Sequence, residues 1–143
     1  MNEQRIETVN QKRLLDSYAL LAYLNEEAGY EMVRDLLNTA QNSGNFIIMN
    51  EINVGETYYI LFRERGPKES DYFLETILNS LPIVMVTNDF QHVIEAARIK
   101  AEYPLSFADC FAVATACREK ASVITGDPEF KKVEHMIEIE WIA

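Results

Sequence analysis

The stretch SVITGDP, residues 122–128, decides the fold, because a short apolar run is followed at once by a glycine, an acid and a proline. The run 122–125 predicts a buried strand, and Gly-Asp-Pro predicts its end. Asp127 is a good N-cap when proline holds the first helical position. The segment RLLD, residues 13–16, has a similar arrangement, with apolar residues at helical spacing after Asp16. Both segments therefore place an acid at the end of a strand.

The rest of the chain alternates in the same way. Further strands are predicted at 46–49, 83–86 and 137–142. Helical spacing of apolar residues is expected over about 19–24, 32–37, 52–62, 73–78, 89–101 and 106–116. Strands joined by helical crossovers indicate an α/β fold, with three layers, α/β/α, around a central and mainly parallel sheet of about five strands.

Length and composition indicate one domain. The 143 residues are 48% hydrophobic, which is enough for one core, and we expect the domain over 13–143 after a polar leader, 1–12, that could be disordered. No run approaches the roughly 18 apolar residues of a membrane helix, so we expect a cytoplasmic protein. Cys110 and Cys117 should lie about 10 Å apart on one helix, too far for a disulfide.

The charge argues against one class of function. The net charge is −10, whereas proteins that bind nucleic acid usually have a basic surface. This objection weakens if several carboxylates are metal ligands, since a bound divalent cation offsets them. Charge alone therefore does not exclude a nucleic-acid substrate.

Four acids occupy places where a parallel sheet forms its ligand site. Asp16 and Asp127 follow strands, Asp109 lies on a helix between strands, and Glu56 lies early in the helix after the second strand. Strand ends and helix starts meet at one edge of such a sheet, so one cleft could hold all four. Crowded carboxylates need a compensating charge, which Mg²⁺ or Mn²⁺ supplies through oxygen ligands. Zinc is disfavoured, because His92 and His135 are isolated.

Each acid also has a purely local explanation, and singly we favour it. Asp16 and Asp127 could simply cap the helices that they precede. Two pairs have the spacing of a capping box, namely Ser106 with Asp109 and Asn53 with Glu56.

Four segments then carry a family resemblance. In order, they are LLDSYALLAYL (14–24), NEINVGETYYIL (50–61), LSFADCFAVATA (105–116) and VITGDPEFKKVE (123–134). The chain resembles the PIN-domain family, especially the VapC-type toxins of toxin–antitoxin pairs, over about 14–142. The resemblance implies a PIN-like domain and a metal-dependent ribonuclease. Its presumed metal and catalytic residues are Asp16, Glu56, Asp109 and Asp127, and the supporting hydroxyls are Ser17 and Thr125.

The sequence departs from the family near the second strand. Toxins of this family often have Ser or Thr near the strand end, where this chain has Asn50 followed by an extra acid, Glu51. Glu51 is therefore an alternative ligand. We prefer Glu56, because the residues after it, 57–61, match the apolar continuation of the family.

By resemblance, the partners are an RNA substrate, a small antitoxin that covers the acidic cleft, and a second copy of the chain in a homodimer. Basic residues that could contact RNA are Arg63, Arg65, Lys68, Lys131 and Lys132. A solvated surface is the favoured explanation for them. Tyr18, Tyr58 and Tyr59 could stack on bases, although core packing is favoured for most of them.

Two other classes of protein fit the sequence less well. A phosphoryl-transfer domain with Asp16 as nucleophile is disfavoured, because a dehalogenase-like site needs a second Asp where Tyr18 stands, and a receiver needs an acidic pair ahead of the first helix. A PIN fold kept as a binding module without catalysis usually shows loss of acids. None of the four is lost here.

Overall fold

A computed structural model describes residues 11–143 of the chain. Most of the predicted leader, 1–12, lies outside the described residues, so that part of the domain assignment stays a prediction.

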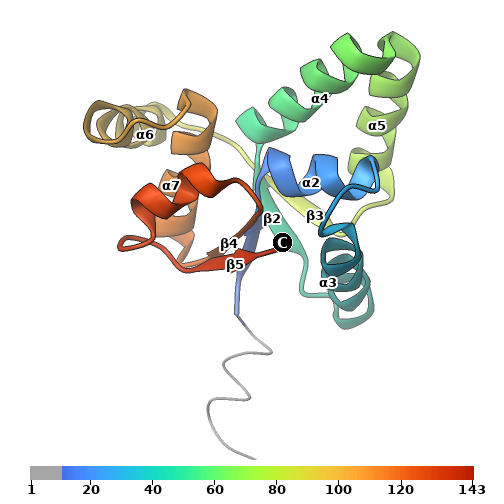
Figure 1. The fold of residues 1–143 in the computed structure, drawn as a ribbon, viewed down its shortest axis with the longest axis horizontal. Coiled ribbons are helices and arrows are strands. Elements are labelled where there is room, and N and C mark those ends of the chain that lie inside the picture. The colour runs from blue at the N-terminus through green and yellow to red at the C-terminus, as the bar shows by residue number, and fades with distance from the viewer. Residues whose placement is uncertain (1–10) are drawn as a thin grey trace, which may run out of the picture.

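The centre of the molecule is a five-stranded sheet in which every strand pairing is parallel (Figure 1). The strand order is β3-β2-β1-β4-β5. The strands are β1 (Arg13–Leu15), β2 (Ile47–Asn50), β3 (Ile83–Val86), β4 (Ser122–Thr125) and β5 (Ile139–Trp141). The prediction of about five mainly parallel strands is confirmed.

Helical segments connect successive strands. They are α2 (Ser17–Leu24), α3 (Tyr30–Ser43), α4 (Glu51–Arg65), α5 (Pro67–Asn79), α6 (Phe90–Glu102), α7 (Phe107–Glu119) and the 3₁₀ helix η1 (Pro128–Val133). In Figure 1, α2 to α5 lie on one side of the sheet, and α6 and α7 on the other.

Two cores lie against the two faces of the sheet. In β1, Leu15 joins a cluster with residues of α2 to α5, whereas Leu14 joins a cluster with residues of α6, α7 and η1. In β4, Ile124 belongs to the first of these clusters and Val123 to the second. Successive strand side chains point to opposite faces, so strands this apolar require helices on both sides. The predicted three-layer α/β/α architecture is confirmed.

Several predicted ends differ from the structure, among them those of β2, which runs over Ile47–Asn50 and not 46–49, and those of α4 and β5. Helix α4 begins at Glu51, because the side chain of Asn50 accepts a hydrogen bond from the backbone N of Ile52 (2.9 Å) and caps the helix. Asn53 is therefore inside the helix and does not form a capping box with Glu56. β5 is also shorter than the predicted 137–142, since only Ile139–Trp141 pairs with β4.

Two expectations about the chain as a whole can be compared with the structure. Over residues 11–143, none of the helices has the length and apolar character needed to cross a membrane.

Cys110 is buried and Cys117 is exposed, and both are free thiols, as their spacing predicted.

Candidate active site

Asp16 lies directly after β1 and is almost completely buried, with 1% of its surface exposed. It caps α2, because its Oδ1 accepts a hydrogen bond from the backbone N of Ala19 at 2.8 Å. Its Oδ2 accepts one from Oγ1 of Thr125 at 2.5 Å. Burial raises the pKa of Asp16 from 3.8 to about 8, against the lowering effect of these two hydrogen bonds. The carboxyl group thus lies in a place that opposes its negative charge.

Asp127 lies beside Asp16 because β1 and β4 are neighbours, with Leu15 level with Ile124. Its Oδ1 accepts a hydrogen bond from the backbone N of Glu129 at 3.0 Å and so begins η1. Its own backbone N donates to Oγ1 of Thr125, also at 3.0 Å. The Thr125 hydroxyl therefore links the two acids.

Glu56 reaches the same place from α4. The hydroxyl of Ser17, the first residue of α2, donates a hydrogen bond to Oε1 of Glu56. Ser17, which directly follows Asp16, thus holds the side chain of Glu56, which lies 39 positions further along the chain. Ser17 and Thr125, which the sequence suggested as supporting residues, each donate a hydrogen bond to the carboxylate of one of the four acids.

Asp109 comes from the first turn of α7, whose N-cap is Ser106. It is 9% exposed. Burial raises the pKa of Asp109 from 3.8 to about 6, a hydrogen bond with Ser106 opposes the shift, and the charges of Asp127, Glu56 and Glu129 add to it. The negative charges of Asp109 and Asp127 in turn add to the raised pKa of Asp16. The four acids, which we call the acidic cluster, are close enough to repel one another.

An open cleft of about 540 Å³ exposes three members of this cluster, Glu56, Asp109 and Asp127, to solvent. The lining residues are Ser17, Tyr18, Leu21, Glu56, Ile60, Pro104, Ser106, Asp109, Asp127, Glu129 and Lys132. Asp16 does not line the cleft. It is buried next to Ser17, which does.

Gly126 allows Tyr18 to line this cleft. A Cβ atom at position 126 would lie 2.6 Å from the Tyr18 ring, closer than atoms can pack. Only glycine therefore lets the ring rest on the turn after β4, where it stays 46% exposed. Tyr59 is exposed as well, whereas the Tyr58 hydroxyl donates to Asp71 at 2.6 Å. Two of the three tyrosines are thus exposed, against the expectation of core packing.

A second group of polar residues lies at the same edge of the sheet, beyond β2 and β3. We call it the amide cluster; its members are Asn50, Glu51, Asn88, His92 and Thr115. Asn50 donates through Nδ2 to Oδ1 of Asn88 (2.7 Å) and to Oγ1 of Thr115 (2.9 Å). Oε2 of Glu51 accepts from the backbone N of Asn88 at 2.7 Å. Glu51, the alternative ligand, therefore belongs to this cluster and does not line the acidic cleft.

His92 completes the amide cluster as a neutral side chain. The Thr115 hydroxyl donates to the carbonyl of Phe111 (2.7 Å), so it accepts from Nε2–H of His92 at 2.9 Å. Burial, followed by the charge on Arg118, lowers the pKa of His92. Within residues 11–143, Nδ1 of His92 has no hydrogen-bond partner, and a carboxylate oxygen of Glu95 lies 3.8 Å away.

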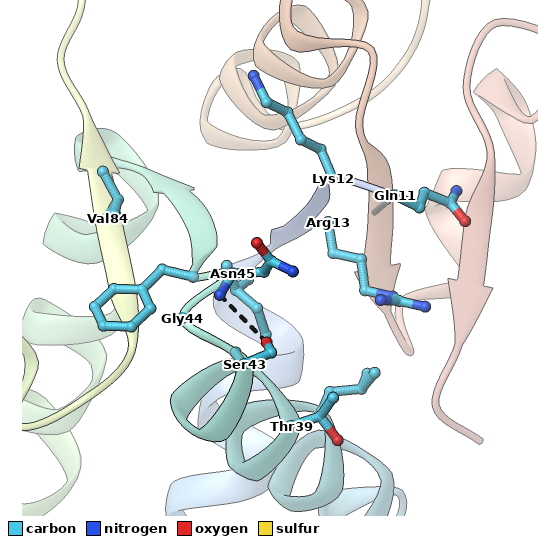
Figure 2. A pocket seen from close by; sticks show the side chains of 12 residues that line it. Gln11, Lys12, Arg13, Thr39, Ser43, Gly44, Asn45 and Val84 are labelled. Atoms are coloured by element: carbon cyan, nitrogen blue, oxygen red, sulfur yellow. Dashed lines mark hydrogen bonds between the residues drawn. The ribbon is translucent and has the colours of Figure 1, made fainter. Parts of the chain in front are cut away.

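A second hollow, of about 480 Å³, opens at the amino ends of β1 and β2 (Figure 2). Its two cations are already paired: Lys12 with Glu119 at 2.9 Å, and Arg13 with Glu140 at 2.8 Å. No acid is among the residues of 11–143 that line it. It therefore offers no carboxylate ligands for a metal ion.

The acidic cluster has the right chemistry for a hard divalent cation, since its donors are carboxylate oxygens. Burial first, and then the neighbouring carboxylates, raise the pKa values of Asp16 and Asp109, so a positive charge placed among these acids would stabilise their ionised forms. In residues 11–143, however, no three His, Cys, Asp or Glu side chains are grouped tightly enough to hold an ion. Metal binding would thus require the carboxylates to move closer together than they lie here.

Comparison with known proteins gives a family and a fold. The family model described as PIN domain matches residues 13–136. A search of curated proteins finds no significant match.

Three solved structures illustrate the likeness of fold. DNA-bound VapBC from Salmonella typhimurium has a TM-score of 0.72 at 19% identity, over 93% of this chain and 99% of that one. VapC20 from Mycobacterium tuberculosis, described as a sarcin-ricin loop cleaving toxin, has a TM-score of 0.66 at 16% identity, over 90% and 99%. FitAcB from Neisseria gonorrhoeae has a TM-score of 0.65 at 17% identity, over 89% and 95%. At such identities the likeness establishes the fold.

Proposed function

The chain belongs to the PIN domain family, and from this premise we propose that it is a metal-dependent endoribonuclease that acts as the toxin of a toxin–antitoxin pair. One observation carries the proposal: Glu56, Asp109 and Asp127, from three separate segments, line one open cleft, the fourth acid, Asp16, is buried beside it, and Asp16 and Asp109 have raised pKa values. Such crowding destabilises a fold unless the site has a use for the charge.

The ligands of the metal would be the carboxylates of Asp16, Glu56, Asp109 and Asp127, with Mg²⁺ or Mn²⁺ as the cation. The bound ion supplies an activated water and offsets the charge that develops on the phosphate during hydrolysis. The chain itself fixes the donors. Thr125 and the start of α2 hold the two oxygens of Asp16, and Ser17 holds Glu56.

The remaining walls of the cleft serve to bind the substrate. Tyr18, Leu21 and Ile60 present apolar surface beside the carboxylates. An unpaired base can stack on an exposed aromatic ring whatever its identity, so this wall suits single-stranded RNA or the loop of a structured RNA.

We also propose an antitoxin partner, a homodimer and a cytoplasmic location. Solved structures of the same fold are described as VapBC and FitAcB complexes. A cleft this acidic would accept a basic side chain from an inhibitor. Exposed apolar residues of α4, Tyr59 and Phe62, could contribute to a dimer interface. Light scattering on the purified chain, alone and co-expressed with the product of the neighbouring short reading frame, tests both assemblies.

The activity is tested by incubating the purified chain with single-stranded RNA and Mg²⁺ or Mn²⁺, with EDTA and Asp16→Asn as controls. Cleavage that both controls abolish supports the proposal. Absence of cleavage, or cleavage that ignores the chelator, contradicts it. RNA binding without cleavage would instead indicate a PIN fold that serves as a binding module.

A further inference from the structure

Within residues 11–143, the lining of the acidic cleft contains one positive charge. Among these lining residues, Glu56, Asp109, Asp127 and Glu129 are acidic, and Lys132 is the one basic residue. A polyanion entering this cleft therefore meets one side chain that attracts phosphate.

Helix η1 determines where Lys132 points. Phe130 and Val133 are fully buried and anchor η1 in the core beside α6 and α7. In a 3₁₀ helix, residues three apart lie above one another, so Glu129 and Lys132 share one face. That face borders the cleft.

Lys132 is held by weak contacts. Its Nζ donates to Oε2 of Glu129, and to the carbonyl of Pro104 at 3.4 Å. The side chains of the pair are 41% and 50% exposed. An exposed pair of this kind contributes little to stability, so Lys132 can exchange one anionic partner for another at low cost.

The other basic residues considered from the sequence lie elsewhere. Lys131, its neighbour, is exposed but does not line the cleft. The guanidinium of Arg63 lies over the Tyr59 ring at 5.0 Å, and Arg65 donates to Oδ1 of Asn25 at 2.5 Å. The structure thus separates two adjacent lysines that the sequence treats alike.

We propose that Lys132 is a substrate-binding residue that holds a phosphate of single-stranded RNA, and that Glu129 is the partner which the phosphate displaces. The inference rests on the proposed function in taking RNA as the ligand of this cleft. Lys132 contacts a phosphate that is not cleaved, so its loss should weaken binding more than turnover. Glu129 acts in the opposite direction, because its carboxylate both occupies Lys132 and repels RNA.

The test measures binding of a fluorescein-labelled phosphorothioate single-stranded RNA, which resists hydrolysis, by fluorescence anisotropy in Mg²⁺ buffer. Lys132→Gln should raise the Kd roughly tenfold, as expected for loss of one charge-assisted contact, and Lys132→Arg should restore most of it. The slope of log Kd against log salt should fall by about 0.7 in Lys132→Gln. Lys131→Gln is the matched control, with an expected change of less than about twofold.

Glu129→Gln should bind the same RNA several-fold more tightly than wild type, whereas Glu134→Gln, which makes the same charge change outside the cleft lining, should have a smaller effect. With cleavable RNA and Mg²⁺, Lys132→Gln should raise KM and leave kcat within about threefold. Thermal unfolding of each variant checks that the fold is kept.

Two results overturn the inference. One is a Kd and salt slope for Lys132→Gln equal to those of Lys131→Gln, and the other is wild-type protein that does not bind the RNA. Failure of the proposed function looks different: wild type would bind the analogue through Lys132 but leave cleavable RNA intact.

Discussion

The acidic cluster and the amide cluster lie at the same edge of the same sheet, and they differ in how their polar groups are satisfied. Asn50 of the amide cluster uses both amide atoms, with partners at Asn88, Thr115 and the backbone of Ile52. Asp16 of the acidic cluster is as deeply buried, yet its pKa is raised to about 8. Position at a strand end therefore does not identify a functional residue. The two clusters differ instead in charge, since burial opposes the ionised form of Asp16, and the proposal that the acidic cluster is the functional one rests on this difference.

The largest expected difference between the clusters is in catalysis. Asp109→Asn should lower kcat/KM for RNA on the order of a hundredfold or more, because it removes a charge at the reacting centre. Asn88→Ala, in the amide cluster, should leave the rate within about threefold. Initial rates with Mg²⁺ measure both. Similar losses in the two variants would show that the distinction between the clusters is wrong.

The next largest effect is a loss of stability, which we expect for a substitution in the amide cluster. Asn50→Ala should lower the free energy of unfolding by about 2–4 kcal/mol, since Thr115 and the N-terminus of α4 lose buried hydrogen bonds. Urea denaturation monitored by circular dichroism measures it. Loss of less than about 0.5 kcal/mol would mean that the network contributes little.

In the acidic cluster, removing a polar group should raise stability when no metal is bound, whereas it lowers stability in the amide cluster. The pKa of Asp16 is 3.8 ordinarily and about 8 in the fold, so folding favours the protonated form. The protonated Asp16 side chain contributes its full stabilisation below about pH 4. This contribution to the free energy of unfolding, on the order of a few kcal/mol, is lost as the pH rises through 8. In EDTA, Asp16→Asn should therefore be more stable than wild type at pH 7.5 and nearly equal at pH 4. Urea titrations at both pH values decide it, and a destabilised variant at pH 7.5 would contradict the charge argument.

The smallest effect concerns Glu51, which the sequence left as an alternative ligand. Glu51→Gln should cost about 1 kcal/mol of stability through its bond to the backbone of Asn88 and should leave RNA cleavage unchanged. Comparison with Glu56→Gln, which should abolish cleavage, assigns the ligand. Loss of activity in Glu51→Gln alone would reverse the assignment.

The sequence predicted most of the sheet. Residues 83–86 and 122–125 form β3 and β4 with the predicted bounds, because each is a short apolar run with a clear end signal. The capping pair at Asn53 was wrong for a non-local reason. Both Asn50 and Asn53 suit an N-cap, and pairing of β2 with β3 extends as far as Asn50, so α4 begins there.

The candidate site was harder to predict in detail. Glu51 and Glu56 lie about 140° apart around a helix, so only one can face the cleft, and packing of α4 against α7 decides which. Lys131 and Lys132 are separated in the same way by the burial of Phe130 and Val133. The amide cluster was not predicted, because its members come from three segments far apart in the chain, at 50–51, 88–92 and 115, and only the pairing of β2 with β3 and the packing of α6 and α7 bring them together.

We propose that the acidic cluster binds a divalent cation through its four carboxylates. Titration of the protein with Mn²⁺, followed by the electron paramagnetic resonance signal of the free ion, measures this directly. We expect wild type to bind Mn²⁺, Asp16→Asn and Asp109→Asn to bind at least about tenfold more weakly, and Glu51→Gln to bind as wild type does. Wild type that binds no Mn²⁺, or binding that both acidic-cluster substitutions leave unchanged, would contradict the claim.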